Sequence, residues 1–189
     1  PSPQGATWTN CIMKSNTIGF EIFGANVTID RCTLISTHEG TSQVGTGIEG
    51  IAGGATNPII KSCLVQNFNT DGIDLSGRGP VMNCTVQTNF RRSAGRGIYA
   101  DNVFNSIFHN NSGEDLTVGI QGETAVKHCI SYGVDGDDDF TGTETNCHGF
   151  SDVTSSGFTL PFHDEAGGNF KPTAGSRAVA GGTNSTGSV

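Results

Sequence analysis

The stretch Asn83-Cys84-Thr85-Val86 returns 22 residues later as Asn105-Ser106-Ile107-Phe108, with Gly97-Ile98 between the two copies. A small residue, cysteine or serine, stands at the same place in both copies, and a short apolar stretch follows it. Self-similarity at a fixed period is the signature of repeat architectures, in which each unit buries its apolar face against its neighbours. This pair therefore predicts stacked coils of roughly 22 residues each.

Two marks extend the repeat along the chain. Cysteine takes the position of Cys84 once per coil, at Cys11, Cys32, Cys63, Cys84, Cys129 and Cys147. Ser106 replaces it between Cys84 and Cys129, and residues 38–45 form an inserted loop between Cys32 and Cys63. Glycine followed by a large apolar residue recurs in step at Gly19, Gly47, Gly72, Gly97 and Gly119, with Asp139-Phe140 as a degenerate sixth copy. Two independent marks with one shared period indicate a solenoid.

We expect an all-β fold, a single-stranded right-handed parallel β-helix of about six to seven coils with a C-terminal capping segment. Parallel strands stacked about 4.8 Å apart place like residues on like and build a continuous core. The cysteines then form a ladder of small residues at an inward corner. The recurring glycine is expected to permit a turn or a backbone conformation that other residues resist.

The six cysteines allow two interpretations. They could form three disulfides, but one cysteine per coil at the same phase favours a stack of buried free thiols. The sequence has no Cys-x-x-Cys pair of the kind that holds zinc.

The coils are expected to occupy residues 1–147, an irregular loop and closing cap residues 148–183, and a disordered tail residues 184–189. The cap is assigned to Asn169-Phe170-Lys171-Pro172 and the short apolar stretch after Gly175-Ser176. At the other end Trp8 and either Phe20 or Phe23 cover the first coil, or that end stacks on a missing N-terminal domain or on another subunit.

Composition narrows the range of partners. The net charge of −8 argues against nucleic acid, because phosphate binding needs clustered Lys and Arg. The acidic charge otherwise serves solubility. No apolar run approaches the roughly 20 residues of a membrane helix, so no membrane insertion is expected.

The Asn-Cys and Gly-Ile marks and the closing segment resemble the pectate-lyase-like superfamily of right-handed β-helix proteins, over roughly residues 8–183. That superfamily includes polysaccharide lyases and hydrolases, cell-surface adhesins and phage tailspikes. The Thr- and Asn-rich coils and the stretch Asp138-Asp139-Phe140-Thr141-Gly142-Thr143 look most like virion proteins of phages.

One segment, Asn69-Thr70-Asp71-Gly72-Ile73-Asp74, is similar to the first active-site motif of polygalacturonases. That family adds an Asp pair one coil later, then Gly-His-Gly and Arg-x-Lys, and this chain departs from all three patterns. The catalytic candidates are therefore Asp71, Asp74 and Asp101, with Arg96 nearby, and inverting hydrolysis would need two of the carboxylates about 6.5–9.5 Å apart. In the alternative, Asn69 and Asp71 form a turn, or Asp71 and Asp74 line a carbohydrate groove.

A run of carboxylates at Asp135, Asp137, Asp138 and Asp139 is the candidate Ca²⁺ site. The alternative is a solvated turn, because the run lacks the pattern of an EF-hand. No other cofactor is expected.

The sequence favours a non-enzymatic structural or interaction protein of a virion (a tailspike, fibre or head-decoration type) or of a cell surface. We expect an extracellular or virion-surface location, a homo-oligomer or a larger assembly, and polysaccharide as a candidate ligand. The alternative is a polysaccharide lyase or glycoside hydrolase.

Overall fold

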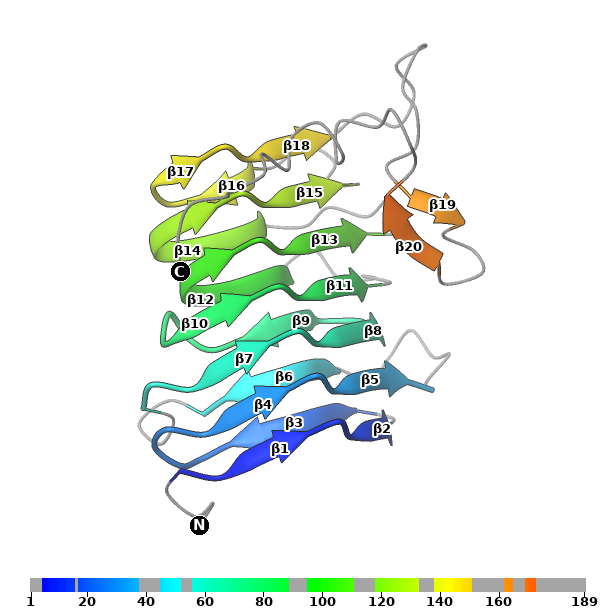
Figure 1. The fold of residues 1–189 in the computed structure, drawn as a ribbon, viewed down its shortest axis with the longest axis vertical. Coiled ribbons are helices and arrows are strands. Elements are labelled where there is room, and N and C mark those ends of the chain that lie inside the picture. Colours follow the sequence, from blue (N-terminus) through cyan, green and yellow to red (C-terminus); the bar gives the residue numbers. More distant parts are fainter. Residues whose placement is uncertain are drawn as a thin grey trace.

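The computed structural model describes residues 5–15, 17–37, 45–51, 56–88, 95–110, 118–132, 138–150, 162–164 and 169–172. Every regular element in these ranges is a β-strand, and the strands stack as a parallel β-solenoid (Figure 1). The predicted fold class is confirmed, whereas its handedness stays a prediction. The stack makes about five turns, slightly fewer than the six to seven coils expected. Its end coils contribute short strands, of three residues in β1 and two in β17.

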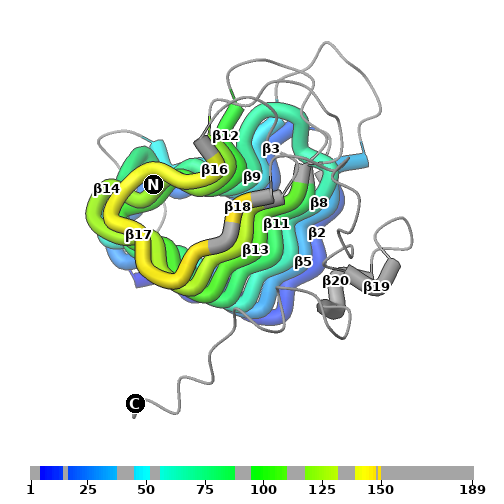
Figure 2. The backbone as a smooth tube through the Cα atoms, turned by 90° about the horizontal axis from the view of Figure 1, so that it is seen from above, coloured from blue at the N-terminus to red at the C-terminus, as the bar shows by residue number. Residues whose placement is uncertain are grey.

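Viewed along its axis, the solenoid shows successive coils superposed on one another (Figure 2). Each coil supplies a strand to three faces in turn. Face 1 contains β1 (Thr7–Thr9), β4 (Thr28–Asp30), β7 (Ile59–Lys61), β10 (Pro80–Met82), the second halves of β12 (Arg96–Phe104) and β14 (Val118–Lys127), and β17 (Glu144–Thr145). Face 2 contains β2 (Ile12–Ser15), β5 (Thr33–Ser36), β8 (Leu64–Phe68), β11 (Thr85–Thr88), β13 (Ile107–Asn110), β15 (Ile130–Tyr132) and β18 (His148–Phe150). Face 3 contains β3 (Ile18–Ile22), β6 (Thr46–Gly50), β9 (Asp71–Asp74), the first halves of β12 and β14, and β16 (Asp138–Thr141).

The core consists of ladders of like residues, one from each coil. On face 3 the inward ladder is Phe20, Ile48, Ile73, Ile98, Ile120 and Phe140, each paired in register with the next. The four isoleucines are fully buried. Phe140 therefore stands where the glycine-apolar repeat placed its sixth copy. Burying a large aliphatic side chain contributes about 1.5–3 kcal/mol relative to leaving it exposed, so the ladders supply the main stabilisation of the stack.

The bend between faces 1 and 2 is built by the residue that precedes each of the six cysteines, or Ser106 in the coil that lacks a cysteine. All seven residues at this position have positive φ between 48° and 55°: Asn10, Arg31, Ser62, Asn83, Asn105, His128 and Asn146. Asparagine tolerates this left-handed conformation better than most residues, which explains its recurrence. The backbone N–H of the bend residue still donates to the next coil, as from Asn83 to the carbonyl of Phe104 at 3.0 Å.

The cysteines repeat one hydrogen bond from coil to coil. Each thiol donates to the carbonyl oxygen two residues upstream, for example from Cys63 to Lys61 at 3.2 Å and from Cys84 to Met82 at 3.3 Å. Ser106 makes the same bond to Phe104 at 2.9 Å. All six cysteines are free thiols, of which Cys32, Cys63, Cys84 and Cys129 are buried and Cys11 and Cys147 are half-buried.

The recurring glycines have a different role from the one expected. Gly19, Gly47 and Gly97 lie within strands β3, β6 and β12 at ordinary φ, so they do not form turns. A Cβ at Gly97 would clash with the carbonyl oxygen of Gly119 in the next coil and with the ring of Phe108 on face 2. The glycines are therefore required for close approach of face 3 to the side chains of face 2, whereas the bend residues carry the positive φ.

The last coil reverses this arrangement. Asp139 occupies the glycine position of β16, and the facing residue on β18 is Gly149, where a Cβ would clash with the Asp139 carboxylate. In three other coils the facing position holds a larger residue, Leu34, Val65 or Phe108. In this coil the larger side chain of the facing pair thus lies on face 3.

The ends of the solenoid differ from the central coils. β18 carries the parallel pairing to Phe150, three residues past Cys147. Within the segment expected to form the cap, β19 (Phe162–Asp164) and β20 (Asn169–Pro172) form an antiparallel pair. The tail at 184–189, Gly175-Ser176 and most of the insertion at 38–45 lie outside the described residues.

Candidate functional site

The outward side of face 3 carries a ladder of polar residues. One residue follows each inward isoleucine or phenylalanine, giving Glu21, Glu49, Asp74, Tyr99, Gln121 and Thr141 in register. All six are exposed or half-buried. Because the inward neighbours are fixed by the core, the backbone holds these outward side chains at the regular spacing of parallel strands, about 4.8 Å.

Asp71 begins strand β9 and lies beside this ladder. It is half-buried, and its Oδ1 accepts a hydrogen bond of 2.8 Å from the backbone N–H of Arg96 in the next coil. Burial raises the pKa of Asp71 to about 6, and Asp74 and Glu49 add to the rise while Arg96 opposes it. The chain bends at Asn69 and Thr70, and Asp71 itself begins the strand that follows this bend.

Arg96 connects the acidic and aromatic parts of the ladder. Its Nη2 lies 3.9 Å from Oδ2 of Asp74, and its guanidinium carbon lies 4.1 Å from the centroid of the Tyr99 ring. A partly exposed ion pair contributes about 0–1 kcal/mol and an exposed cation–π contact about 0.5–1 kcal/mol, so these contacts orient the guanidinium more than they stabilise the fold.

Tyr99 extends the network to the following strand. Its hydroxyl donates to Oε1 of Glu123 at 2.6 Å, and this hydrogen bond raises the pKa of Tyr99. On the other side, Oδ1 of Asp74 accepts a 2.7 Å hydrogen bond from the backbone N–H of Ser76. We call Asp71, Asp74, Arg96, Tyr99 and Glu123 the face 3 cluster.

Asp101 takes a separate position at the bend of β12 between faces 3 and 1. The hydroxyl of Thr124 donates to its Oδ1 at 2.5 Å, and the amide of Asn102 donates to its Oδ2 at 2.6 Å. The structure thus brings together three of the four catalytic candidates, Asp71, Asp74 and Arg96, and ties Asp101 to Thr124 on β14.

Three residues of this region were missed from the sequence. Glu49 and Tyr99 each stand two residues after a ladder glycine, so the register of the repeat could have identified them. Burial, Glu21 and Asp74 raise the pKa of Glu49, in that order. No sequence signal pointed to Glu123, which reaches Tyr99 only because β14 pairs with β12.

The candidate Ca²⁺ residues are only partly described. Asp135 and Asp137 lie outside the described residues, while Asp138 and Asp139 begin strand β16 and do not belong to a loop. The Asp139 carboxylate points toward Gly149 on face 2. Within the described ranges, no three His, Cys, Asp or Glu side chains gather as ligands for a metal ion.

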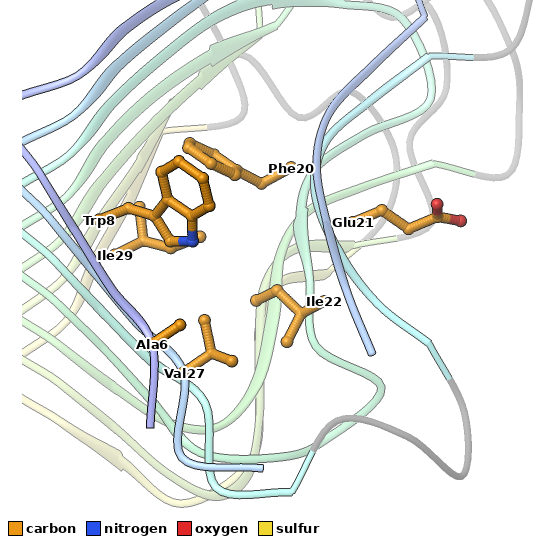
Figure 3. Close-up of a pocket in the computed structure, with 7 residues that line it drawn as sticks. All are labelled: Ala6, Trp8, Phe20, Glu21, Ile22, Val27 and Ile29. Atoms are coloured by element: carbon orange, nitrogen blue, oxygen red, sulfur yellow. The ribbon is translucent and has the colours of Figure 1, made fainter. Parts of the chain in front are cut away.

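The N-terminal end of the solenoid holds an apolar cavity of about 90 Å³. Trp8 and Phe20 approach each other across the coil, with ring centroids 5.6 Å apart and planes tilted by 53° (Figure 3). Ala6, Ile22, Val27 and Ile29 line the rest, and Glu21 points away. Trp8 stays 49% exposed and Phe23 47%, so the aromatic pair covers this end only in part.

Comparisons with protein-family models, with curated proteins and with solved structures found no match to this chain. Among the residues that the structure describes, no helix has the length and apolar character needed to cross a membrane.

Proposed function

We propose that this protein is a structural and interaction module that binds a neutral polysaccharide along the outward side of face 3. The observation that carries the proposal is the face 3 cluster, in which a guanidinium, a phenol ring and carboxylates are held by mutual contacts along adjacent strands. Sugars offer hydroxyl groups to carboxylates and guanidinium groups and apolar faces to aromatic rings. A preorganised set of such groups lowers the entropic cost of binding.

The direction of the ladder favours an extended ligand. The outward residues of face 3 follow the axis of the stack, so a linear polymer could contact several coils at once. Glu21, Glu49 and Asp74 form an acidic row on three successive strands. This row would repel a polyanion, which favours a neutral chain as the ligand.

The wider role is part of the same proposal. We place the protein among right-handed β-helix proteins of the pectate-lyase-like kind, on a virion or at a cell surface, where a rigid stack presents a binding face outside the cell. Its N-terminal end would join another subunit or domain. The exposed apolar side chains there support this, with Ile12 exposed to 77% and Trp8 to 49%.

Affinity electrophoresis and isothermal titration calorimetry against a panel of neutral and acidic polysaccharides test the binding role. We expect a neutral polymer to bind and Tyr99→Ala and Arg96→Ala to weaken that binding at least about tenfold, a loss of about 1.4 kcal/mol. Lys61→Ala on face 1 is the matched control for Arg96→Ala, because Lys61 is also half-buried and pairs with a carboxylate, Asp30, at 3.8 Å. Equal loss in the control, or no binding across the panel, would contradict the proposal.

One observation favours hydrolysis as a second candidate function. Asp71 has its pKa raised to about 6 and stands beside Asp74, whereas a general acid must be protonated near the working pH. The test is reducing-end release from the polymer that binds. Turnover that Asp71→Asn abolishes while binding persists would establish the enzyme, and binding without turnover would support the structural role.

A further inference from the structure

The first coil of the solenoid ends in strand edges that no described strand covers. β1 and β3 are the two ends of one sheet, and β2 is an end of the other. In the second coil, Thr28 donates its backbone N–H toward the N-terminal end, to the carbonyl of Ala6 at 2.8 Å. Thr7 pairs in register with Thr28, so its own N–H points out of the stack in the same direction. An exposed edge of this kind is a template for pairing with another strand.

Apolar side chains are concentrated at the same end. Among the side chains that the structure describes, every large apolar residue that is exposed belongs to the first coil: Trp8, Ile12, Ile18 and Phe23. Trp8 and Phe20 line the apolar cavity of about 90 Å³ (Figure 3). An exposed apolar end with aromatic residues at its centre is typical of a protein–protein interface.

We propose that two copies of this chain associate through their N-terminal ends about a two-fold axis that passes beside Trp8. The axis turns the second solenoid over, so that its strands run antiparallel to those of the first. β1 then pairs with the partner's β1, with Trp8 opposite the partner's Trp8. Thr7 and Thr9 exchange backbone hydrogen bonds with the partner's Thr9 and Thr7, as opposite residues do in an antiparallel pair.

Charged and apolar side chains at the rim of this end match in the same arrangement. The two-fold axis sets β2 opposite the partner's β3. Ile12 and Lys14 lie two residues apart on β2, and Glu21 and Phe23 lie two residues apart at the end of β3. Antiparallel pairing thus sets Lys14 against the partner's Glu21 and Ile12 against the partner's Phe23. All four residues are exposed, and the symmetry makes each contact twice.

The C-terminal end of the solenoid does not fit the same surface. The inward column that Trp8 begins on face 1 ends at Glu144, which is exposed and pairs in register with Val126. Head-to-tail stacking would place this carboxylate against the apolar cavity, and burying an unpaired carboxylate is costly. Head-to-tail stacking also continues into a filament, whereas a two-fold axis closes after two copies. The N-terminal surface therefore favours a dimer.

Sedimentation equilibrium of the full chain tests the dimer, and Trp8, the only tryptophan in the sequence, reports on the interface. We expect a dimer that dissociates on dilution. The fluorescence emission of Trp8 should shift to shorter wavelength as the dimer forms, because the indole ring leaves water. A monomer at every concentration up to about 1 mM, an assembly larger than a dimer, or a dimer that forms without a change in emission would each overturn the proposal.

Charge reversal tests the contact between Lys14 and the partner's Glu21. Lys14→Glu and Glu21→Lys should each raise the Kd of the dimer at least about tenfold, because each creates two contacts between like charges. The double variant should restore the wild-type Kd, and its failure to do so would contradict the two-fold arrangement. Lys127→Glu, at an exposed lysine on β14, is the matched control and should leave the Kd unchanged.

This inference rests on the part of the proposed function that places a subunit at the N-terminal end, and it specifies that subunit. Polysaccharide binding on face 3 is measured separately by calorimetry. A chain that binds polysaccharide but stays monomeric would overturn the dimer and leave the binding role intact. A dimer that binds no polysaccharide would support the dimer and contradict the binding role.

Discussion

The inward and outward sides of face 3 differ in how much their residues vary from coil to coil, although both belong to the same strands. The inward ladder holds isoleucine in four successive coils with phenylalanine at either end, whereas the outward ladder changes from glutamate to aspartate, tyrosine, glutamine and threonine. Inward residues must fill the same cross-section in every coil, because the interior is close-packed. Outward residues do not have to fill a fixed cross-section, so their side chains differ from coil to coil.

The difference separates what holds the molecule together from what it can recognise. A change on the inward side should lower stability, and a change on the outward side should alter titration or binding at little cost to stability. Four predictions test this separation.

The largest effect is expected for Ile73→Ala in the middle of the inward ladder. The side chain is fully buried between Ile48 and Ile98, so its loss leaves a cavity and should lower the free energy of unfolding by about 3 kcal/mol. Gln121→Ala on the outward side should change it by less than about 0.5 kcal/mol. Urea unfolding followed by circular dichroism measures both, and similar losses would contradict the separation.

Gly97→Ala should have the next largest effect. Its new Cβ would meet the Gly119 carbonyl and the Phe108 ring, and overpacking of this kind costs about 1–3 kcal/mol. Asn83→Gly is the matched change at the bend, where glycine accepts the φ of 54° without strain. We expect Asn83→Gly to lower the free energy of unfolding by less than about 1 kcal/mol. If urea unfolding showed a larger loss for Asn83→Gly than for Gly97→Ala, the repeated glycines would have the turn-forming role that the sequence suggested.

These two positions show how far the sequence alone could lead. The shared phase of the cysteines and glycines was sufficient to predict a parallel stack, because residues that stack in register recur along the sequence at one period. It was not sufficient to predict which position has positive φ, since the positions of Asn83 and Gly97 both repeat from coil to coil and either could have adopted that conformation. Asp71, Asp74 and Arg96 were found through a local motif. Tyr99 was missed although the register of the repeat places it on the outward side, and Glu123 could not be found because the Tyr99–Glu123 contact exists only once β12 and β14 are paired.

Asp71→Asn should change how stability depends on pH. The pKa of Asp71 is about 6 in the folded protein and near 3.9 in an unfolded chain. Between about pH 4 and pH 6, the Asp71 carboxyl is therefore protonated in the folded protein and ionised in the unfolded chain. The contribution of this group to stability is then present below about pH 4 and is lost as the pH rises through 6.

The amide variant cannot ionise, but its oxygen can still accept the Arg96 N–H bond. It should therefore be more stable than the wild type at pH 7 by about 1–2 kcal/mol, with the full linkage value reduced for solvent screening. At pH 4 the difference should vanish. Thermal or urea unfolding from pH 4 to 7 measures this, and parallel curves for the two proteins would show that Asp71 ionises normally.

The smallest effect is expected for Tyr99→Phe, and it separates two roles of one residue. The change removes the hydrogen bond to Glu123 but keeps the ring over which the Arg96 guanidinium lies, so stability should fall by less than about 1 kcal/mol. If the ring faces the polysaccharide, Tyr99→Phe should retain most of the binding that Tyr99→Ala loses, as measured by calorimetry. If the two variants lose binding equally, the hydroxyl and its hydrogen bond to Glu123 carry recognition instead, and the outward ladder acts through hydrogen bonding alone.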